Sequence, residues 1–481
     1  MKKMAILGVL CAATVEAAMA GHALAAPPRE AQPNDTLQTR LAPVTMGGLT
    51  SDQVAVRAQE TSFDAAARRQ ALASAEARLE QARNAYIPKL TLTGNYTRLS
   101  ELTQPTFSFG TSGGMNQNTF PIVIPLNRFL FQATLTIPIS DYVLRLSQSY
   151  AAASRNQRAA QLDQQAARLK AATDGRVAYY AWLRAKGQLI VAERALDQSK
   201  AHLDDAHNAF DVGTSSKADV LRVESQLARA ELVVAQAQNL VEVTEEQLRV
   251  AMHDASGRRY EVGEDLRLDP APAAGLDNLA ALRAEALERR LEVRALDETA
   301  WSLREQAKVA RAGNYPRLDI FGDAFYANPN PRIFLPDNTF RASWDAGVQI
   351  VWTPNDTLNA APASADAEAR ASQTEMQKQA LRDSVKMEVI QAFNAMHEAE
   401  VALQTTTRGL AAAEEGYRVR RELLQNGRST SVELTDSEVE LFRASLDAIN
   451  ARTTLYAARA SLLHAVGRDI PASLGASMAR R

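Results

Sequence analysis

The sequence predicts a mainly α-helical protein with a membrane β-barrel: an internally duplicated α-barrel of long helices plus four β-strands per protomer, which make a twelve-stranded barrel in a trimer. Three observations support this fold class: an internal duplication, two pairs of strands with alternating polarity, and long proline-free stretches with helical periodicity. The duplication organises the chain, the strands indicate a membrane, and the helices make up most of the mass.

The first 25 residues have the layout of a secretory signal peptide. Two lysines precede an apolar run that ends at Val15, and small residues follow up to Ala25. The run is shorter than the ~20 residues that span a bilayer, so we expect cleavage after Ala25 and export of the chain. The only cysteine, Cys11, lies in this segment, which excludes disulfides and thiolate metal sites from the mature chain.

Composition narrows the class of protein further. The 481 residues carry a net charge of only -2, which does not predict a nucleic-acid partner. Beyond the signal, no apolar run approaches the length of a membrane-spanning helix. An exported chain of this kind is either a soluble periplasmic or extracellular protein or a membrane β-barrel.

Two halves of the chain resemble each other. The segment from Gly213 to Leu221 matches the segment from Gly427 to Thr435, and each is followed at the same spacing by a glutamate and a leucine. A strand entry with a proline, at Pro88 and again at Pro316, is repeated in the same order. These matches place the first repeat at about 49–252 and the second at about 276–466.

The remaining segments connect or flank the repeats. A stretch with two prolines and several glycines, 253–275, is typical of a linker or small side domain. An N-terminal extension is expected at 26–48 and a C-terminal tail at 467–481.

Each repeat contains one pair of strands, at about 88–139 and 316–353. Apolar and polar residues alternate with a period of two, which predicts one apolar and one polar face. Each strand is about ten residues long, as expected for a tilted membrane strand, and aromatic residues gather near the strand ends. The alternative is an ordinary half-buried sheet of a soluble protein, which would not explain why everything around it is helical.

The remainder of each repeat has helical periodicity. No proline occurs between Asp141 and Phe210, so a single helix of ~100 Å is possible at 1.5 Å per residue. Apolar seams with spacings of three and four begin at Val223 and at Leu441, and a second seam runs beside the latter from Phe442. Two adjacent seams indicate neighbours on both sides, which suits a helix in the wall of a closed α-barrel.

The strand count has a consequence for assembly. Four strands cannot close a barrel, and open sheet edges are not tolerated in lipid. Three copies would supply twelve strands, an allowed closed barrel, so an oligomer is expected if the strands lie in the membrane.

This ordered set of features resembles the TolC-type outer-membrane efflux proteins over nearly the whole mature chain. It rests on the signal peptide, the duplication, the order helix, hairpin, long helix, glycine turn and helix, and the two Gly-(Thr/Arg)-Ser turns at Gly213 and Gly427. The resemblance implies a trimeric exit duct in the cell outer membrane with a periplasmic helical tunnel. It also implies passive export of small molecules or proteins, a periplasmic adaptor protein as partner, and an inner-membrane transporter of the RND or ABC type.

The resemblance also carries over functional residues. The family's paired acidic residues fall on Glu433 and Asp436, and its latch aspartate falls on Asp219. Its gate tyrosine and gate arginine fall on Leu424 and Ser429, which depart from the pattern, although an arginine, Arg428, stands next to the latter. The adaptor-docking tips would be the two turns, formed by Gly213, Thr214 and Ser215 and by Gly427 and Arg428.

Simpler interpretations compete with these assignments. Carboxylates at a helix start are favoured by the helix dipole, so Asp219, Glu433 and Asp436 could simply cap or decorate helices. As a ring around a threefold axis they would instead attract cations. The histidines are scattered, and no phosphate-loop pattern occurs, so the sequence predicts no enzyme, no metal site and no cofactor.

Two other classes of protein remain as alternatives. A periplasmic adaptor also contains long helical hairpins, but it would need lipoyl-like β-repeats, which are absent from the sequence. An exported structural coiled coil would leave the duplicated strand pairs unexplained.

Overall fold

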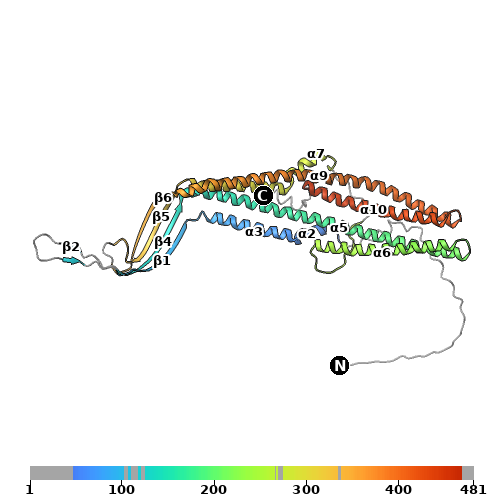
Figure 1. Ribbon diagram of the computed structural model, residues 1–481, viewed down its shortest axis with the longest axis horizontal. Coiled ribbons are helices and arrows are strands. Elements are labelled where there is room, and N and C mark those ends of the chain that lie inside the picture. The colour runs from blue at the N-terminus through green and yellow to red at the C-terminus, as the bar shows by residue number, and fades with distance from the viewer. Residues whose placement is uncertain are drawn as a thin grey trace, which may run out of the picture.

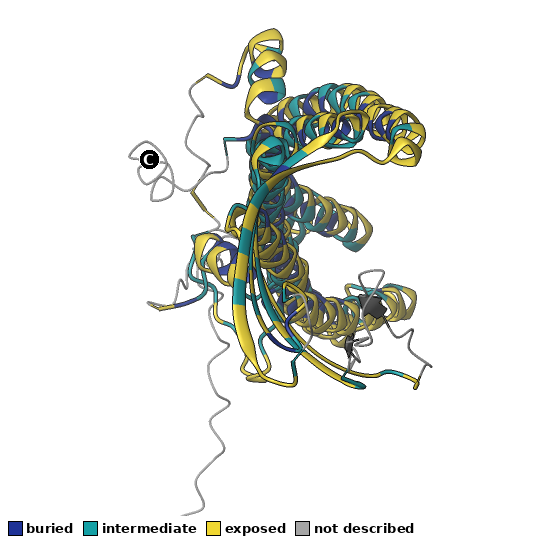
Figure 2. Ribbon diagram, turned by 90° about the vertical axis from the view of Figure 1, so that its left-hand side faces the viewer, coloured by how far each residue is buried: buried dark blue, intermediate teal, exposed yellow. Residues whose placement is uncertain are grey.

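The computed structural model describes residues 47–101, 107–109, 118–120, 125–265, 267–268, 275–333 and 337–468. The predicted signal peptide lies outside these ranges, as do nearly all of the N-terminal extension and the C-terminal tail. The described part is elongated, with a β-sheet at one end and helix-to-helix turns at the other (Figure 1). Viewed from the sheet end, the helices and the sheet curve around one open side (Figure 2).

Helices account for most of both repeats. In the first repeat they are α2 (Ser51–Thr61), α3 (Phe63–Asn84), α4 (Ile139–Asp141), the π-helical turn η1 (Tyr142–Leu146), α5 (Ser147–Asp211) and α6 (Lys217–Ala251). In the second they are α7 (Leu279–Arg289), α8 (Leu291–Arg311), the 3-10 turn η2 (Ala312–Asn314), α9 (Pro354–Gln425) and α10 (Ser431–Val466). The order of the long helices is the same in both repeats, as the duplication predicts.

Four long strands form one antiparallel sheet in the order β1-β4-β5-β6. Their bounds are β1 (Lys89–Arg98), β4 (Asn127–Pro138), β5 (Arg317–Asn328) and β6 (Arg341–Val351). A separate short pair, β2 (Phe107–Phe109) and β3 (Asn118–Phe120), lies in the connection between β1 and β4. The four predicted strands and their helical surroundings are therefore confirmed.

The register of the sheet separates its two faces. Leu92, Ala133, Ala324 and Trp344 lie in one row across the four strands. On this face the side chains of Leu92, Trp344 and Ile350 are 75%, 74% and 73% exposed. Such a broad exposed apolar face is unusual for a protein surface in water and is expected where lipid is the solvent.

The opposite face of the sheet carries hydrogen-bonded polar side chains. Gln132 Nε2 donates to Asp323 Oδ1 at 2.8 Å, and Gln349 Nε2 donates to Asp319 Oδ2 at 3.3 Å. Arg317 Nε also donates to Asp319 Oδ2, at 3.0 Å. The predicted alternation thus places apolar residues on one side and a polar network on the other.

Helix α10 has neighbours on both sides, as its two seams predict. Leu455 and Leu462 pack in a cluster with Val389 of α9, while Ile449 packs in a second cluster with Trp182 of α5. Gly187 lets α5 approach closely, because a Cβ atom at this position would lie 2.7 Å from Ile449 Cγ2. The long helices therefore form a continuous layer rather than separate pairs.

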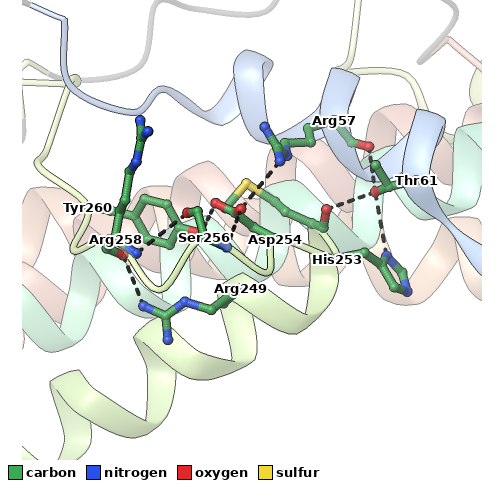
Figure 3. Close-up of polar contacts among 9 residues, drawn as sticks. Arg57, Thr61, Arg249, His253, Asp254, Ser256, Arg258 and Tyr260 are labelled. Carbon is green, nitrogen blue, oxygen red and sulfur yellow. Dashed lines mark hydrogen bonds and ion pairs between the residues drawn. The ribbon is translucent and has the colours of Figure 1, made fainter.

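The segment after α6 folds back against α2 (Figure 3). Asp254 accepts hydrogen bonds from the Tyr260 hydroxyl at 2.8 Å and the Ser256 N–H at 3.0 Å, and it forms an ion pair with Arg57 at 3.4 Å. The hydrogen bond from Tyr260 lowers the pKa of the Asp254 carboxyl most, and the Ser256 N–H adds to the effect. Thr61 Oγ1 donates to the Met252 carbonyl at 2.9 Å. These contacts fix the beginning of the linker to the N-terminal helix of the first repeat.

Within the described ranges, none of the helices combines the length and the hydropathy that crossing a membrane requires.

Candidate functional site

The two predicted docking turns lie at the same end of the molecule, opposite the sheet (Figure 1). One turn joins α5 to α6, and the other joins α9 to α10. The chain reverses direction at each turn within a few residues, so both repeats present a loop at this tip.

Both turns have the same backbone geometry. Gly213 and Gly427 have φ values of 75° and 66°, in the left-handed region that favours glycine. The N–H of Gly427 donates to the Leu424 carbonyl at 2.9 Å, and the N–H of Arg428 donates to the Leu423 carbonyl at 2.8 Å. Gly213 and Thr214 repeat these bonds at the end of α5. Each glycine thus ends a long helix and caps its last carbonyls.

Both following helices begin with a capping box. The Ser216 hydroxyl accepts from the Asp219 N–H at 3.2 Å, while Asp219 Oδ2 accepts from the Ser216 N–H at 3.3 Å. Thr430 and Glu433 make the corresponding pair at the start of α10. Asp219 and Glu433 therefore satisfy free N–H groups at the helix starts, the role that the simpler interpretation gives them.

The capping contacts also set the charge of these two acids. The Ser216 hydroxyl donates to Asp219 Oδ2 at 2.7 Å and lowers the pKa of that carboxyl. The Ser429 hydroxyl has the same effect on the pKa of Glu433. Both carboxyls are held in their charged form by these hydrogen bonds.

Glu433 and Asp436 differ in their surroundings. Glu433 Oε2 forms an ion pair with Arg420 of α9 at 2.9 Å, so part of its charge is balanced within its own hairpin. Asp436 is exposed one turn further along α10, and in the described part of the chain its carboxylate makes no ion pair or hydrogen bond. Of the two predicted constriction acids, Asp436 keeps its charge free.

The residues at the predicted gate positions differ in their exposure and contacts within one chain. Leu424 is half-buried near the end of α9, and Ser429 donates to Glu433. The side chain of Arg428 is exposed. Within the ranges that the structure describes, no direct hydrogen bond or ion pair joins Asp219 to the second turn. The predicted latch residues therefore do not meet within one chain.

A different polar contact links the two repeats near the tip. His202 of α5 lies 3.2 Å from Glu438 Oε2 of α10, and Gln226 Nε2 of α6 donates to the same oxygen at 3.0 Å. In the sequence, Glu438 is the glutamate that follows the second glycine turn, at the same spacing at which Glu224 follows the first. Glu224 is exposed, whereas Glu438 is buried, and nothing in the local sequence distinguishes them.

Charged side chains are exposed at the tip, among them those of Asp436 and Arg428. Over the described residues, histidine, cysteine and acidic side chains nowhere gather in threes as metal ligands would. His202 and His207 do not form a pair for a metal, because His202 is engaged with Glu438 and Ser431.

Comparison with known proteins identifies the family. The sequence matches the family described as outer membrane efflux protein over residues 54–252 and 282–468. No curated protein sequence matches the chain significantly.

Solved structures of outer-membrane channels share the fold. The outer membrane protein VceC of Vibrio cholerae has a TM-score of 0.69 at 16% identity, and the match covers 87% of this chain and 96% of that one. The CmeC outer membrane channel of Campylobacter jejuni has 0.67 at 14%, with 90% and 92% covered. The open state of the MtrE outer membrane channel of Neisseria gonorrhoeae has 0.67 at 19%, with 87% and 88% covered.

The chain belongs to the outer membrane efflux protein family. The predicted resemblance is thereby confirmed, and so is the predicted fold class of a helical tunnel joined to a membrane sheet. The family is one of channels rather than of enzymes, and it places the protein in the cell outer membrane with its long helices in the periplasm.

Proposed function

We propose that this protein is the outer-membrane exit duct of a tripartite efflux or type I secretion system. Three copies form one continuous tunnel, and small molecules or proteins leave through it passively. A partner in the inner membrane supplies the energy.

The single observation that carries this proposal is the open sheet with an exposed apolar face. Its edge strands, β1 and β6, have no partner on their outer sides within the described chain. All three pairings in the sheet are antiparallel, so β1 and β6 run in opposite directions. The β6 strand of one protomer can therefore pair antiparallel with β1 of the next, and three copies close the sheet with no free edge.

Exposed apolar residues on the outer helices support the same assembly. On α6, the side chains of Leu232 and Val250 are 59% and 63% exposed, and on α9 those of Met376 and Val401 are 64% and 52% exposed. In a closed ring, α6 and α9 are the outermost long helices of each protomer and face neighbouring copies. Burial of these side chains would contribute roughly 25 cal/mol per Å² of apolar surface removed from water.

The turns at Gly213 and Gly427 are the proposed docking tips for a periplasmic adaptor protein. They are exposed, lie at the same end of the molecule, far from the sheet, and are held by capping contacts. An inner-membrane transporter of the RND or ABC type would complete the system. A photo-crosslinking residue at Arg428, followed by identification of the captured partners, would test the docking and distinguish the two transporter types.

The test of the exit-duct proposal combines location, assembly and conduction. We expect the full chain in the outer-membrane fraction, as a trimer in mild detergent that dissociates on heating, with ion conductance in planar bilayers. A periplasmic adaptor or a structural coiled coil would instead remain in the periplasmic fraction and conduct no ions. That outcome would contradict the proposal.

A further inference from the structure

A cavity of about 430 Å³ lies between α6 and α10, near the tip, with α5 along its floor. Figure 1 shows these three helices running together toward the two turns. The volume is in the range of pockets that hold drug-sized molecules. Much of its lining is apolar, with contributions from all three helices: Ala192, Ala195, Ala230, Val233, Val439 and Phe442.

One wall of this cavity carries a buried carboxylate, that of Glu438. Its side chain is only 6% exposed. Oε2 accepts from Gln226 Nε2 at 3.0 Å and lies 3.2 Å from His202 Nδ1. His202 Nε2 lies 3.2 Å from the Ser431 hydroxyl. A hydrogen on Nδ1 would let His202 donate to Glu438, with Nε2 within hydrogen-bond distance of Ser431.

Polar atoms on the same wall have no partner. Glu438 Oε1, Gln226 Oε1 and Thr435 Oγ1 are buried without a hydrogen bond, and all three residues line the cavity. Buried polar atoms without a hydrogen-bond partner are uncommon in folded proteins, and they can mark a place where a water, an ion or a ligand binds. The terminal torsion of a glutamate is broad, so a small rotation turns Oε1 toward the cavity. Glu438 Oε1, as a carboxylate oxygen, and Gln226 Oε1 accept hydrogen bonds only, so a ligand that donates fits this wall.

The charge at this wall specifies the missing group. In the described residues the polar partners of the Glu438 carboxylate are His202 and Gln226, and both contact Oε2, which leaves Oε1 available. An ammonium group supplies three donors and one positive charge. Arg222 and Arg229 line the cavity as well, so a ligand with one positive charge is favoured over a polyamine.

We propose that this cavity binds a small amphipathic amine with a single positive charge. Its ammonium group contacts Glu438, Gln226 and Thr435, and its apolar part packs against Val233 and Phe442. The bound molecule joins α6 of the first repeat to α10 of the second. This assignment goes beyond the exit-duct function and does not depend on conduction.

The duplication provides a matched control. Glu224 occupies the equivalent position on α6, but its side chain is exposed and does not line the cavity. Glu438→Gln removes the charge from the cavity and keeps the size of the side chain, while Glu224→Gln makes the same chemical change outside it. Ala195→Leu fills part of the cavity without altering the polar wall.

The test is a fluorescence titration of the purified full-length protein in lipid nanodiscs with dansylcadaverine, a primary amine with an apolar dansyl group. Its N-acetylated form, which has no charge, serves as the matched ligand, and empty nanodiscs supply the background. We expect saturable binding with a blue shift for the wild type and for Glu224→Gln. Glu438→Gln, Ala195→Leu and the acetylated ligand should each lower the affinity at least tenfold.

Two results would overturn the proposal. The first is equal affinity of the wild type and Glu438→Gln for the amine, with both proteins folded by circular dichroism. The second is equal binding of the amine and its acetylated form, which would indicate partition into lipid. If Glu438→Gln does not fold, Ala195→Leu decides: unchanged affinity in that variant also contradicts the assignment.

Discussion

At the tip, neighbouring acidic residues have different tasks. Asp219 and Glu433 complete capping boxes and accept hydroxyl hydrogen bonds, whereas Asp436 is exposed without a partner in the described chain. In a threefold assembly, Asp436 would occur three times around the axis with its charge free. We therefore propose that Asp436 contributes more than Glu433 to a cation-attracting ring at the periplasmic entrance.

This proposal gives a prediction on ion selectivity. Asp436→Asn should strongly reduce the cation preference of the channel, because it removes an unpaired charge. Glu433→Gln should reduce it less, because Arg420 already balances part of that charge. Reversal potentials in a salt gradient across a planar bilayer measure both effects. A larger loss in Glu433→Gln than in Asp436→Asn would contradict the assignment.

The capping carboxyls predict a pH dependence of stability. Folding lowers the pKa of both Asp219 and Glu433, so their contribution is present above the pKa of the unfolded carboxyls and is lost as the pH falls through the lower, folded pKa. Wild type should melt at a higher temperature than the Asp219→Asn/Glu433→Gln variant above about pH 5, and the difference should shrink below about pH 4. Thermal melts followed by circular dichroism at several pH values measure this. A difference that grows toward acid pH would be inconsistent with these caps.

The capping boxes are visible in the sequence, and the buried contact is not. Ser216 and Asp219, like Thr430 and Glu433, have the spacing of a capping box, so their local role could be predicted. The contact between His202 and Glu438 joins residues 236 positions apart. It depends on how α5 and α10 are rotated against each other, which local patterns do not specify.

At the scale of elements, the glycine turns predict a sharp dependence on backbone conformation. A Cβ atom at position 427 would have no neighbouring atom within 4 Å. A substitution of Gly427 is therefore strained by the positive φ of the backbone and not by a clash. A residue with a Cβ in this region costs roughly 1–2 kcal/mol. Gly427→Val should therefore loosen the tip and weaken adaptor docking.

Two variants serve as controls for this turn. Gly427→Asn should be tolerated better, because asparagine adopts the left-handed conformation more readily. Gly409→Ala, within α9 and with open space around it, should leave the tip unchanged. Limited proteolysis at the turn measures loosening, and equal cleavage of the valine and asparagine variants would argue against a strained turn.

The two faces of the sheet predict opposite effects of adjacent substitutions. Ile350 lies on the exposed apolar face, and a charge there costs roughly 2–4 kcal/mol at the bilayer midplane. Ile350→Arg should therefore impair insertion or trimer assembly. Gln349→Arg should be tolerated, because this position faces the carboxylate of Asp319 on the polar side.

The yield of heat-modifiable trimer in the outer-membrane fraction measures both variants. Equal yields of the two would mean that the assignment of the faces is wrong.

The strands were predictable from the sequence because a period of two is a strong local signal in segments about ten residues long. The neighbours of α10 were predictable as well. Its two apolar seams predict a helix on each side, and in the structure these helices are α5 and α9. The order of strands in the sheet was not predictable from polarity. Pairing of β4 with β5 joins the two repeats across an intervening stretch that contains the longest helix of the first repeat.

At the scale of the whole molecule, a single protomer leaves sheet edges unpaired and apolar side chains exposed. Among the described residues, the sheet has two unpaired edges and an exposed apolar face. The helices and the sheet curve around one open side (Figure 2). The strand count predicts an oligomer, because four strands cannot close a barrel, and the family resemblance implies that three copies supply twelve strands. Closure of the barrel would place β6 of one protomer beside β1 of the next, and this proposed contact can be measured directly.

The most direct measurement is disulfide cross-linking between β1 and β6 of neighbouring protomers. The predicted mature chain has no cysteine, so introduced thiols are the only ones present. Thr93→Cys on β1 would be combined in turn with Ser343→Cys, Asp345→Cys or Gln349→Cys on the same polar face of β6. Ala346→Cys and Val348→Cys, on the apolar face, are the matched controls.

Closure of the barrel by three copies predicts oxidised dimers and trimers, and nothing larger, for at least one polar-face pair. The controls should cross-link poorly, because their thiols lie on the opposite side of the sheet. Two results would contradict a closed barrel of three copies. One is that every polar-face pair yields monomers alone, and the other is a ladder of cross-linked species that continues beyond the trimer.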